Sequence, residues 1–336
     1  MNQKEGVLRP PYRAQVSEAN LLVAAGTDNG VLVFRPEGTG WTLTAQGLYG
    51  RKVPALAFHP DGSLYAGAAN GTVYRSTDLE HWEPLFEGLS HPSVHSLVIC
   101  PADFKRLIAG TEPACIFRSD DRGSTWTKLP AFNAVPGASK WSNQVPPYMP
   151  KVTGLSYQGH SIVATIEVGG ALLSEDDGQT WVEIHNGLAK DVTGLASHPD
   201  RPGVLFATTG LGFHRSDDNG QSWKNLNGGL PYIFTQGLAI DPADPDRLVM
   251  GVNKVRRGGG AHLFRSSNGG QNWQITTGGF APTPDACLTC VASGPGCFVA
   301  GTDKGDLFGT FDFGDLWKRI RPGLPPVRGV AVGPGR

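Results

Sequence analysis

Residues 119–126 read Ser119-Asp120-Asp121-Arg122-Gly123-Ser124-Thr125-Trp126, and this stretch decides the fold. It follows the pattern Ser/Thr-x-Asp/Asn-x-Gly-x-x-Trp, which recurs at four further places: residues 174–181, 216–223, 266–273 and 310–317. Two more copies are degraded, since residues 76–82 are one residue short and residues 36–41 keep only Gly38 and Trp41. Seven segments of the chain therefore end in a tryptophan.

The seven tryptophans are regularly spaced. Successive intervals of 41, 44, 55, 42, 50 and 44 residues separate Trp41, Trp82, Trp126, Trp181, Trp223, Trp273 and Trp317. A period in the forties is typical of one four-stranded unit per repeat. Strand patterns precede and follow each box, and such antiparallel units protect their edges when they close into a ring. The sequence therefore predicts an all-β fold, a seven-bladed β-propeller.

The two ends of the repeat array are complementary. Residues 20–27 carry the pattern of a second strand, whereas residues 327–332, after the seventh tryptophan, carry that of a first strand. Blade one is therefore predicted to be closed by N- and C-terminal strands, and deletion of the last strand should open the ring. The repeats run from residue 20 to the end without a linker, so we expect a single propeller domain over residues 1–336.

These boxes resemble the BNR or Asp-box repeat over almost the whole chain. Sialidases, xyloglucan-active hydrolases, sortilin-type receptors and photosystem II assembly factors resemble one another in this repeat, so it indicates the fold better than the activity. Overall the chain is most similar to soluble bacterial BNR-repeat proteins labelled glycosyl hydrolase. The resemblance implies that the boxes are structural turns on the face opposite an active site. Their acidic or amide positions are Asp121, Asp176, Asp218, Asn268 and Asp312.

Elementary chemistry agrees with a structural role for the boxes. An Asx side chain accepts hydrogen bonds from nearby backbone N–H groups, glycine adopts a positive φ, and tryptophan supplies buried area. A calcium loop would need a closing glutamate, which the boxes lack.

Sialidase activity is not expected. That family requires an arginine triad, an early Arg-Ile-Pro and a Tyr–Glu pair on six blades, whereas this chain offers only Arg9-Pro10.

Composition excludes some partners. With 29 basic and 30 acidic residues the net charge is close to zero, so broad electrostatic binding to nucleic acid or to a membrane is not expected. The start of the chain has no apolar stretch of signal-peptide length, and no run of 18 apolar residues occurs. The five cysteines do not form a disulfide framework, and Cys287 and Cys290 fall on a predicted strand rather than a metal-binding turn. We expect a cytoplasmic protein.

Two insertions interrupt the repeats. Residues 132–150 are rich in proline and contain Trp141, the one tryptophan outside the boxes. Long loops in compact domains often act as lids, so this insertion either closes over a ligand or caps exposed apolar surface. Residues 253–260 form a basic, glycine-rich turn whose spacing does not match a phosphate-binding loop.

Alignment of the blades converges on polar residues near blades three and four. The turns between second and third strands place one residue per blade at a common position: Asp28, Ala69, Glu112, Glu167, Gly210, Asn253 and Asp303. The first strands place Pro54, His95, Thr153, Thr193, Gln236 and Arg328 near the channel, with Lys52, His91, Lys151 and Asp191 just ahead. Glu112 and Glu167 lie on adjacent blades, which the longer insertion connects.

Three interpretations of this cluster are open. Glu112 and Glu167, with His95, could act as an acid and base pair for glycoside cleavage if one carboxyl is desolvated more than the other. Alternatively, His91, His95, Glu112 and Glu167 could bind a divalent metal, since imidazole and carboxylate suit zinc, iron or manganese. The third interpretation is structural, with the glutamates accepting hydrogen bonds from turn N–H groups.

Two hypotheses from different classes follow. In the first, the chain binds a small molecule or a glycan in the funnel, as a possible hydrolase, with contacts from His91, Trp141, Tyr148, Lys151 and Arg328. In the second, it is a non-catalytic scaffold that docks a protein partner on the lid face. A recessed pocket with raised carboxyl pKa values would favour the first hypothesis, and a funnel filled by Trp141 with an exposed apolar rim would favour the second. No cofactor other than the candidate divalent metal is indicated, and the oligomeric state is left open.

Overall fold

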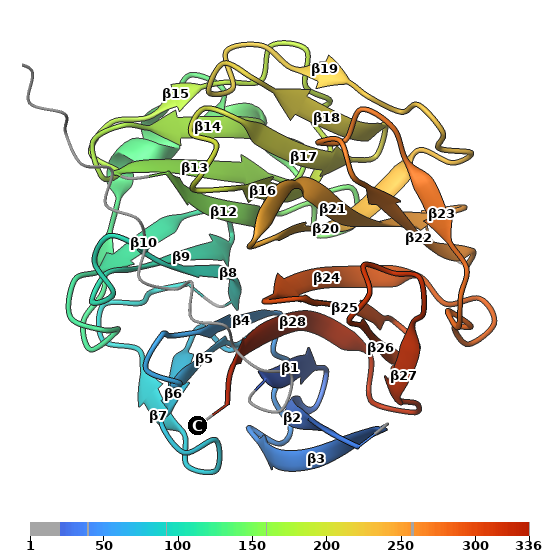
Figure 1. Cartoon of the computed structure of the whole chain (residues 1–336). Helices are drawn as coiled ribbons and strands as arrows, with labels where there is room; N and C mark the ends of the chain where they lie inside the picture. Colours follow the sequence, from blue (N-terminus) through green and yellow to red (C-terminus); the bar gives the residue numbers. More distant parts are fainter. Residues whose placement is uncertain (1–20, 39, 92, 159, 257–258, 336) are drawn as a thin grey trace, which may run out of the picture.

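The computed structural model describes residues 21–38, 40–91, 93–158, 160–256 and 259–335. Seven four-stranded antiparallel sheets form a ring (Figure 1), which confirms the predicted seven-bladed β-propeller. Three sequence features lie outside the described residues, namely Arg9-Pro10, the start of the first predicted strand at Asn20, and Arg257 with Gly258 in the basic turn. No helix in the described ranges has both the length and the apolar character needed to cross a membrane.

The strands of each blade are given from the channel outward; in six blades they are consecutive in the chain, and blade 1 combines the last strand with the first three. Blade 1 contains β28 (Val327–Pro334), β1 (Leu21–Thr27), β2 (Gly30–Glu37) and β3 (Gly40–Gly47). Blade 2 contains β4 (Ala55–Phe58), β5 (Leu64–Gly67), β6 (Val73–Ser76) and β7 (Glu83–Leu85). Blade 3 contains β8 (Ser93–Ile99), β9 (Leu107–Glu112), β10 (Ile116–Ser119) and β11 (Thr127–Lys128).

The remaining four blades repeat this order. Blade 4 contains β12 (Val152–Gln158), β13 (Ser161–Ile166), β14 (Gly170–Ser174) and β15 (Val182–Glu183). Blade 5 contains β16 (Val192–Ser197), β17 (Leu205–Thr209), β18 (Gly212–Ser216) and β19 (Lys224–Asn225). Blade 6 contains β20 (Phe234–Asp241), β21 (Asp244–Asn253), β22 (Ala261–Ser266) and β23 (Gln274–Thr276). Blade 7 contains β24 (Leu288–Gly294), β25 (Cys297–Thr302), β26 (Leu307–Thr310) and β27 (Lys318–Arg321).

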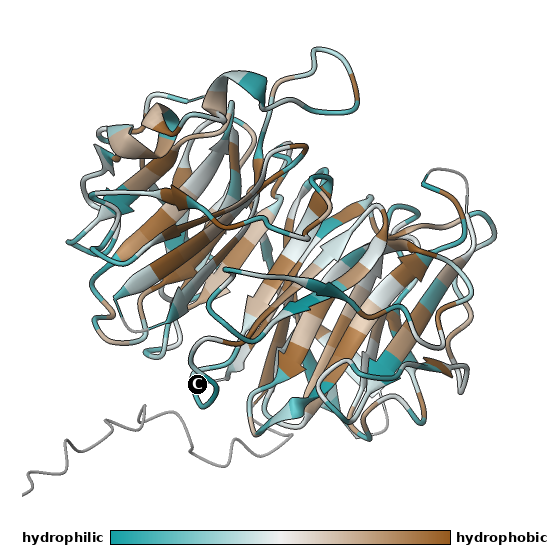
Figure 2. Cartoon of the chain, turned by 90° about the horizontal axis from the view of Figure 1, so that it is seen from above, coloured by the Kyte–Doolittle hydropathy of each residue, from teal (hydrophilic) through white to brown (hydrophobic). Residues whose placement is uncertain are grey.

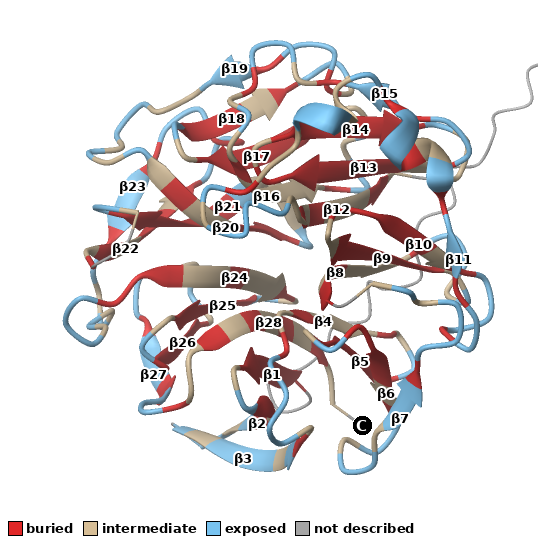
Figure 3. Ribbon diagram, turned by 180° about the vertical axis from the view of Figure 1, so that it is seen from behind, coloured by how far each residue is buried: buried red, intermediate tan, exposed pale blue. Residues whose placement is uncertain are grey.

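The ring closes through blade 1. Strand β28 pairs antiparallel with β1 from Leu21 opposite Pro334 to Gly26 opposite Gly329, as predicted from the two ends of the repeat array. The two middle strands of each blade are mostly buried, and the innermost strands mix buried with half-buried residues because they face the channel. The outermost strands such as β3, β7 and β23 are largely exposed (Figure 3). Hydrophobic residues accordingly concentrate on the strands and hydrophilic ones on the connections (Figure 2).

The box turns are held by side-chain hydrogen bonds. Ser119 Oγ donates to Asp121 Oδ1 at 2.7 Å and accepts from the Gly123 amide at 2.8 Å. Asp121 also accepts from the Thr125 amide and hydroxyl at 2.9 and 2.7 Å. The residue before the glycine is left-handed as well, with φ of 62° at Arg122, so the box needs two positive φ values rather than the one expected from the glycine. Equivalent bonds are made at Asp176, Asp218, Asn268 and Asp312.

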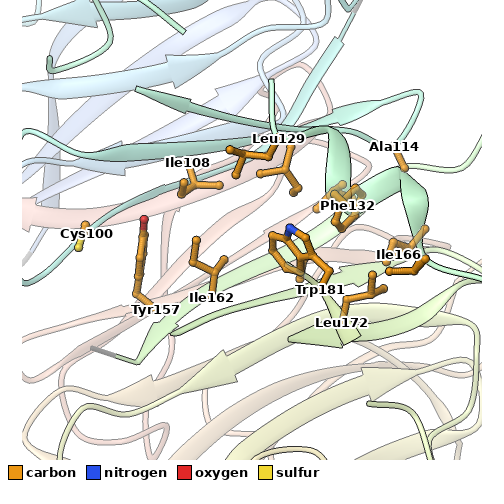
Figure 4. Packing of buried hydrophobic residues seen from close by; sticks show 14 residues of the cluster. Cys100, Ile108, Ala114, Leu129, Phe132, Tyr157, Ile162, Ile166, Leu172 and Trp181 are labelled. Carbon is orange, nitrogen blue, oxygen red and sulfur yellow. The ribbon is translucent and has the colours of Figure 1, made fainter. Parts of the chain in front are cut away.

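Clusters of buried apolar side chains fill the spaces between neighbouring blades. In the cluster between blades 3 and 4, the ring centroids of Trp181 and Phe132 are 5.1 Å apart (Figure 4). Phe132 belongs to the longer insertion and is fully buried. The insertion also carries two short 3₁₀ turns, η2 (Pro130–Ala134) and η3 (Ala138–Lys140). Its first half is therefore part of the core and not a detached lid.

Candidate functional site

The candidate site lies at one mouth of the central channel, where the first strands β28, β4, β8, β12, β16, β20 and β24 enclose a cavity of about 440 Å³. One residue per blade forms a mainly polar ring: Pro54, His95, Thr153, Thr193, Gln236, Thr289 and Arg328. Two positions further along each strand lies an aliphatic ring: Leu56, Leu97, Leu155, Leu195, Leu238, Val291 and Val330. The cavity is therefore polar at the mouth and apolar deeper in the channel.

Most residues of the polar ring lie at β-bulges in the first strands. In five blades the pairing of the first strand skips one residue, and the skipped residue is the one in the polar ring: His95, Thr153, Thr193, Thr289 and Arg328. In blade 6 the skipped residue is Gly237, next to Gln236. A bulge releases one residue from the ladder and re-aims its side chain. The bulges explain why polar side chains reach the cavity from strands that are otherwise apolar.

The ring threonines are already bonded to the protein. Thr193 Oγ1 donates to the Thr235 carbonyl at 2.7 Å, and Thr289 Oγ1 donates to the Val327 carbonyl at 2.8 Å, so each connects neighbouring blades. Thr153 Oγ1 lies 3.1 Å from Thr165 Oγ1 within blade 4. Gln236, in contrast, makes no side-chain hydrogen bond within the described residues. Its amide is therefore available to a ligand.

Ion pairs surround the mouth. His95 Nε2 lies 2.7 Å from Glu112 Oε2, and Lys151 Nζ lies 2.7 Å from Glu167 Oε2. On the opposite side of the ring, Arg328 Nη2 lies 2.6 Å from Asp28 Oδ2. These charges come from the turns and bulges that the blade alignment singled out.

A second, looser cluster includes Arg256. Its Nη2 lies 3.4 Å from Glu167 Oε1, and its Nη1 lies 3.6 Å from Asp191 Oδ2. Lys52 is exposed and forms no ion pair within 4.0 Å among the described residues, although its charge lowers the pKa values of Asp28 and Glu112. Lys52 and Arg256 are thus the cations of the mouth that are held least tightly.

The carboxyl groups differ in their pKa values. The hydrogen bond from His95 lowers the pKa of Glu112, and the hydrogen bond from Arg328 lowers the pKa of Asp28. Burial raises the pKa of Asp191, and the Arg256 charge opposes this only in part. The acid and base hypothesis requires a general acid with a raised pKa. The pKa of Glu112 is lowered, so Glu112 does not meet this requirement. The carboxyl at the mouth whose pKa is raised is that of Asp191.

The structure brings together some of the residues singled out in the sequence and separates others. His95, Lys151, Glu167 and Arg328 line the cavity, and Glu112 lies beside it on His95. His91, Trp141 and Tyr148 are not among the lining residues.

Of the three residues outside the cavity, two pack against aromatic side chains and the third is exposed. His91 packs edge-on against Phe117 with ring centroids 5.2 Å apart, and burial lowers its pKa. Trp141 packs on Phe132 at 5.1 Å and joins the core cluster between blades 3 and 4. Tyr148 is 59% exposed. Trp141 therefore caps apolar surface, which was one of the two expectations for the insertion.

The candidate metal ligands are not assembled. Within the described residues, no group of three or more His, Cys, Asp or Glu side chains is arranged to hold a metal ion. His91 lies on Phe117, away from the cavity, while Glu112 is engaged by His95 and Glu167 by Lys151. The cysteines are free thiols, buried except for Cys290, which is partly exposed.

Thr289 and Phe234 also line the cavity but were not singled out in the sequence. Thr289 precedes Cys290 as Thr193 precedes Gly194, so the register of the repeat contained the signal. Phe234 stands two positions before Gln236, where Lys151 and Asp191 stand before Thr153 and Thr193. Only charged and histidine residues were singled out just ahead of the ring, which is why the aromatic Phe234 was missed.

Comparison with known proteins relates this propeller to xyloglucanases. No family model matches the chain. An oligoxyloglucan-reducing end-specific xyloglucanase from Emericella nidulans is 24% identical over 356 residues, which cover 91% of this chain and 41% of that protein. The xyloglucanase Xgh74A from Acetivibrio thermocellus is 29% identical over 246 residues, covering 61% of this chain and 28% of that protein. The chain thus spans less than half the length of these curated relatives.

Solved structures share the fold. The GH74 xyloglucanase from Xanthomonas campestris superposes with a TM-score of 0.61 at 16% identity, covering 80% of this chain and 45% of that one. A structure of YCF48 bound to D1 peptide superposes with a TM-score of 0.58 at 18% identity, covering 80% of this chain and 81% of that one. At these identities the superpositions show only that the fold is shared. The activity has to be argued from the residues of the site.

Proposed function

We propose that this protein binds a glycan at the mouth of its central channel. The curated relatives are xyloglucanases, and the mouth combines the groups that sugars require. Gln236 and Lys52 supply donors that the protein does not use, and Phe234 adds an aromatic surface to the cavity wall. Sites for small ligands typically combine an apolar wall with a few precisely placed polar groups. We also place the chain among the Asp-box repeat proteins, on the hydrogen-bonding pattern of its five complete boxes.

The bulged polar ring carries this proposal. A propeller needs no bulge to close its ring, and blade 2 has none in its first strand. Five blades nevertheless interrupt a ladder at the residue that lines the cavity. Bulges are over-represented beside functional sites, where they redirect a side chain.

Binding without cleavage by Glu112 and Glu167 fits the electrostatics best. A glycosidase needs one carboxyl that is protonated at the working pH and one that is ionised. The hydrogen bond from His95 lowers the pKa of Glu112, so Glu112 does not suit the role of the protonated acid, and Glu167 is already engaged by Lys151 and Arg256. Hydrolysis by this pair stays a prediction, and it is tested by looking for reducing ends in the binding experiment below.

Titration calorimetry with xyloglucan oligosaccharides and other neutral and acidic oligosaccharides tests the proposal. We expect one of them to bind wild type, and Gln236→Ala to weaken binding about fivefold, since a lost neutral hydrogen bond contributes about 1 kcal/mol. The matched control is Gln179→Ala, an exposed glutamine in a box turn away from the cavity. Absence of binding by wild type, or equal loss in both variants, would contradict a glycan site at the mouth.

A second candidate function, docking of a protein on the same face, is favoured by the distribution of exposed apolar side chains. Among the described residues, eleven large hydrophobic side chains are exposed, and seven lie in connections on the mouth face: Tyr49, Phe86, Tyr148, Met149, Leu211, Ile233 and Val255. These are the connections between blades and between second and third strands, which also carry Lys151, Glu167 and Arg256. Exposed apolar groups that collect on one face are typical of interaction surfaces.

Cross-linking to partners in a cell extract separates this candidate from the first. Leu211→Ser combined with Ile233→Ser should abolish the cross-links, because both side chains lie on the mouth face of blades 5 and 6. Val182→Ser combined with Ile275→Ser alters exposed apolar residues of outer strands and should leave the cross-links in place. Cross-links that survive both changes would contradict docking on the mouth face.

A further inference from the structure

We propose that Glu167, Asp191 and Phe234 form a guanidinium-binding site, which Arg256 of the same chain occupies in this structure. The site goes beyond the proposed glycan binding and does not depend on it. Its parts come from three blades: Glu167 follows β13, Asp191 precedes β16, and Phe234 begins β20. Arg256 reaches them from the connection between β21 and β22 of blade 6.

The seated guanidinium shows what the site recognises. One terminal nitrogen of Arg256 faces Glu167 at 3.4 Å and the other faces Asp191 at 3.6 Å. Its Cζ atom lies 5.6 Å from the ring centroid of Phe234. Two carboxylates at the edge of a planar cation and an aromatic ring within cation–π range match the shape and charge of a guanidinium.

One carboxylate of the site is buried, the other is partly buried, and Arg256 reaches both only at long distances. Glu167 is 8% exposed. Gln144 of the insertion lies beside Asp191, but Asp191 Oδ1 is buried and makes no hydrogen bond in the described part of the chain. Hydrogen bonds between cations and carboxylates normally span about 2.7 to 2.9 Å, shorter than both Arg256 distances. A guanidinium that is free of the backbone of blade 6 can approach both oxygens more closely.

The charge balance specifies a monovalent cation. Lys151 already neutralises Glu167 through Oε2 at 2.7 Å, so removal of Arg256 leaves one uncompensated negative charge among Glu167, Asp191 and Lys151. A buried, uncompensated carboxylate is costly, which drives the uptake of a replacement cation. The aromatic wall favours a delocalised organic cation over a metal ion, which prefers oxygen ligands all round.

The site opens to solvent on the mouth face, since the Arg256 side chain is 35% exposed. A free guanidino compound and an arginine side chain of a peptide offer the same chemistry there. Either ligand has to displace Arg256, so Arg256 acts as a tethered competitor and sets the affinity of the site.

Chemical rescue tests the proposal with the full chain. Arg256→Gln vacates the site, and methylguanidine is the probe. We expect methylguanidine to raise the thermal midpoint of Arg256→Gln and to bind it at least tenfold more tightly than wild type. The matched control is Lys254→Gln, because Lys254 is on the same connection but lies over Tyr232 at 6.0 Å. This control should bind methylguanidine as wild type does.

Two further variants keep the test decisive. Adding Asp191→Asn to Arg256→Gln should remove the rescue, and Arg256→Ala should reproduce it if Arg256→Gln folds poorly. An arginine-containing tetrapeptide, compared with its lysine counterpart, distinguishes the two sources of guanidinium. Tighter binding of the arginine peptide than of methylguanidine assigns the site to a protein ligand, and the reverse order assigns it to a free compound. Equal, weak binding of methylguanidine to wild type and to both Arg256 variants would overturn the proposal.

Discussion

Arg118 of blade 3 donates a hydrogen bond from Nη1 to the carbonyl of Asp177 in the box turn of blade 4, at 3.0 Å. The same relationship connects Arg215 to Gly269 at 2.8 Å and Arg265 to Phe313 at 3.0 Å. In each case the acceptor is the left-handed residue before the box glycine. The box turn therefore closes its own blade and also presents a carbonyl to the arginine of the preceding blade.

Arg118→Met should weaken the ring between blades 3 and 4. The change leaves the Asp177 carbonyl without its charged donor, and a hydrogen bond to a charged group contributes about 1.5 kcal/mol or more. The exposed ion pair to Asp120 adds little to this. Urea unfolding at neutral pH should show a loss of about that size in the free energy of unfolding.

Arg35→Met is the matched control for this prediction. Arg35 occupies the corresponding position of blade 1, is exposed, and its side chain makes no hydrogen bond among the described residues. Its replacement should change the midpoint little. Equal losses for Arg35→Met and Arg118→Met would show that the cross-blade bond does not stabilise the ring.

The Asp218 carboxylate should make stability depend on acid pH. Hydrogen bonds from the Ser222 hydroxyl and amide lower its pKa to about 2, below the value of about 3.9 in an unfolded chain. The folded state therefore gains stability above the unfolded pKa and loses it as the pH falls through the folded pKa. Asp218→Asn, which keeps an acceptor but removes the charge, should flatten the pH profile between about pH 4 and pH 2.

Thermal midpoints across this pH range measure the effect. Glu175→Gln removes a neighbouring exposed acid of another box turn and serves as the control. An unchanged slope in Asp218→Asn would mean that other carboxyl groups carry the acid sensitivity.

The last strand should be essential for closure of the ring. Val327 in β28 is fully buried, and β28 supplies the whole channel edge of blade 1. Truncation after Pro326 should therefore expose the edge of β1 and abolish the cooperative unfolding transition, whereas truncation after Pro334 should preserve it. Hydrogen exchange of the β1 amides provides the readout. Protection of β1 in the shorter chain would contradict closure by β28.

The register of the repeat predicted much of the fold and part of the site. It predicted the blades, the closure by β28 and the ring that contains His95 and Arg328, because a fixed period places equivalent residues at equivalent depths. The approach of Arg256 to Glu167, 89 residues apart, was not predicted, because it depends on the path of an irregular connection. The β-bulges were also missed, since an extra residue in a strand does not break the apolar alternation enough to be seen.

The role of Trp141 differs between the sequence-based expectation and the structure, and mutation can test which is correct. A tryptophan in a proline-rich insertion is consistent with a ligand contact, yet its ring packs on Phe132 and contributes to the core between blades 3 and 4. Trp141→Ala should therefore lower the free energy of unfolding by about 2 kcal/mol, less than for a fully buried tryptophan because the side chain is partly exposed. Trp141→Phe should recover most of this loss.

Oligosaccharide affinity, measured where the variant is folded, should stay within about twofold of wild type, since a residue outside the cavity contributes little binding energy. If Trp141→Ala instead loses much of its oligosaccharide affinity while its unfolding midpoint is unchanged, Trp141 contacts the ligand and the structural role is wrong.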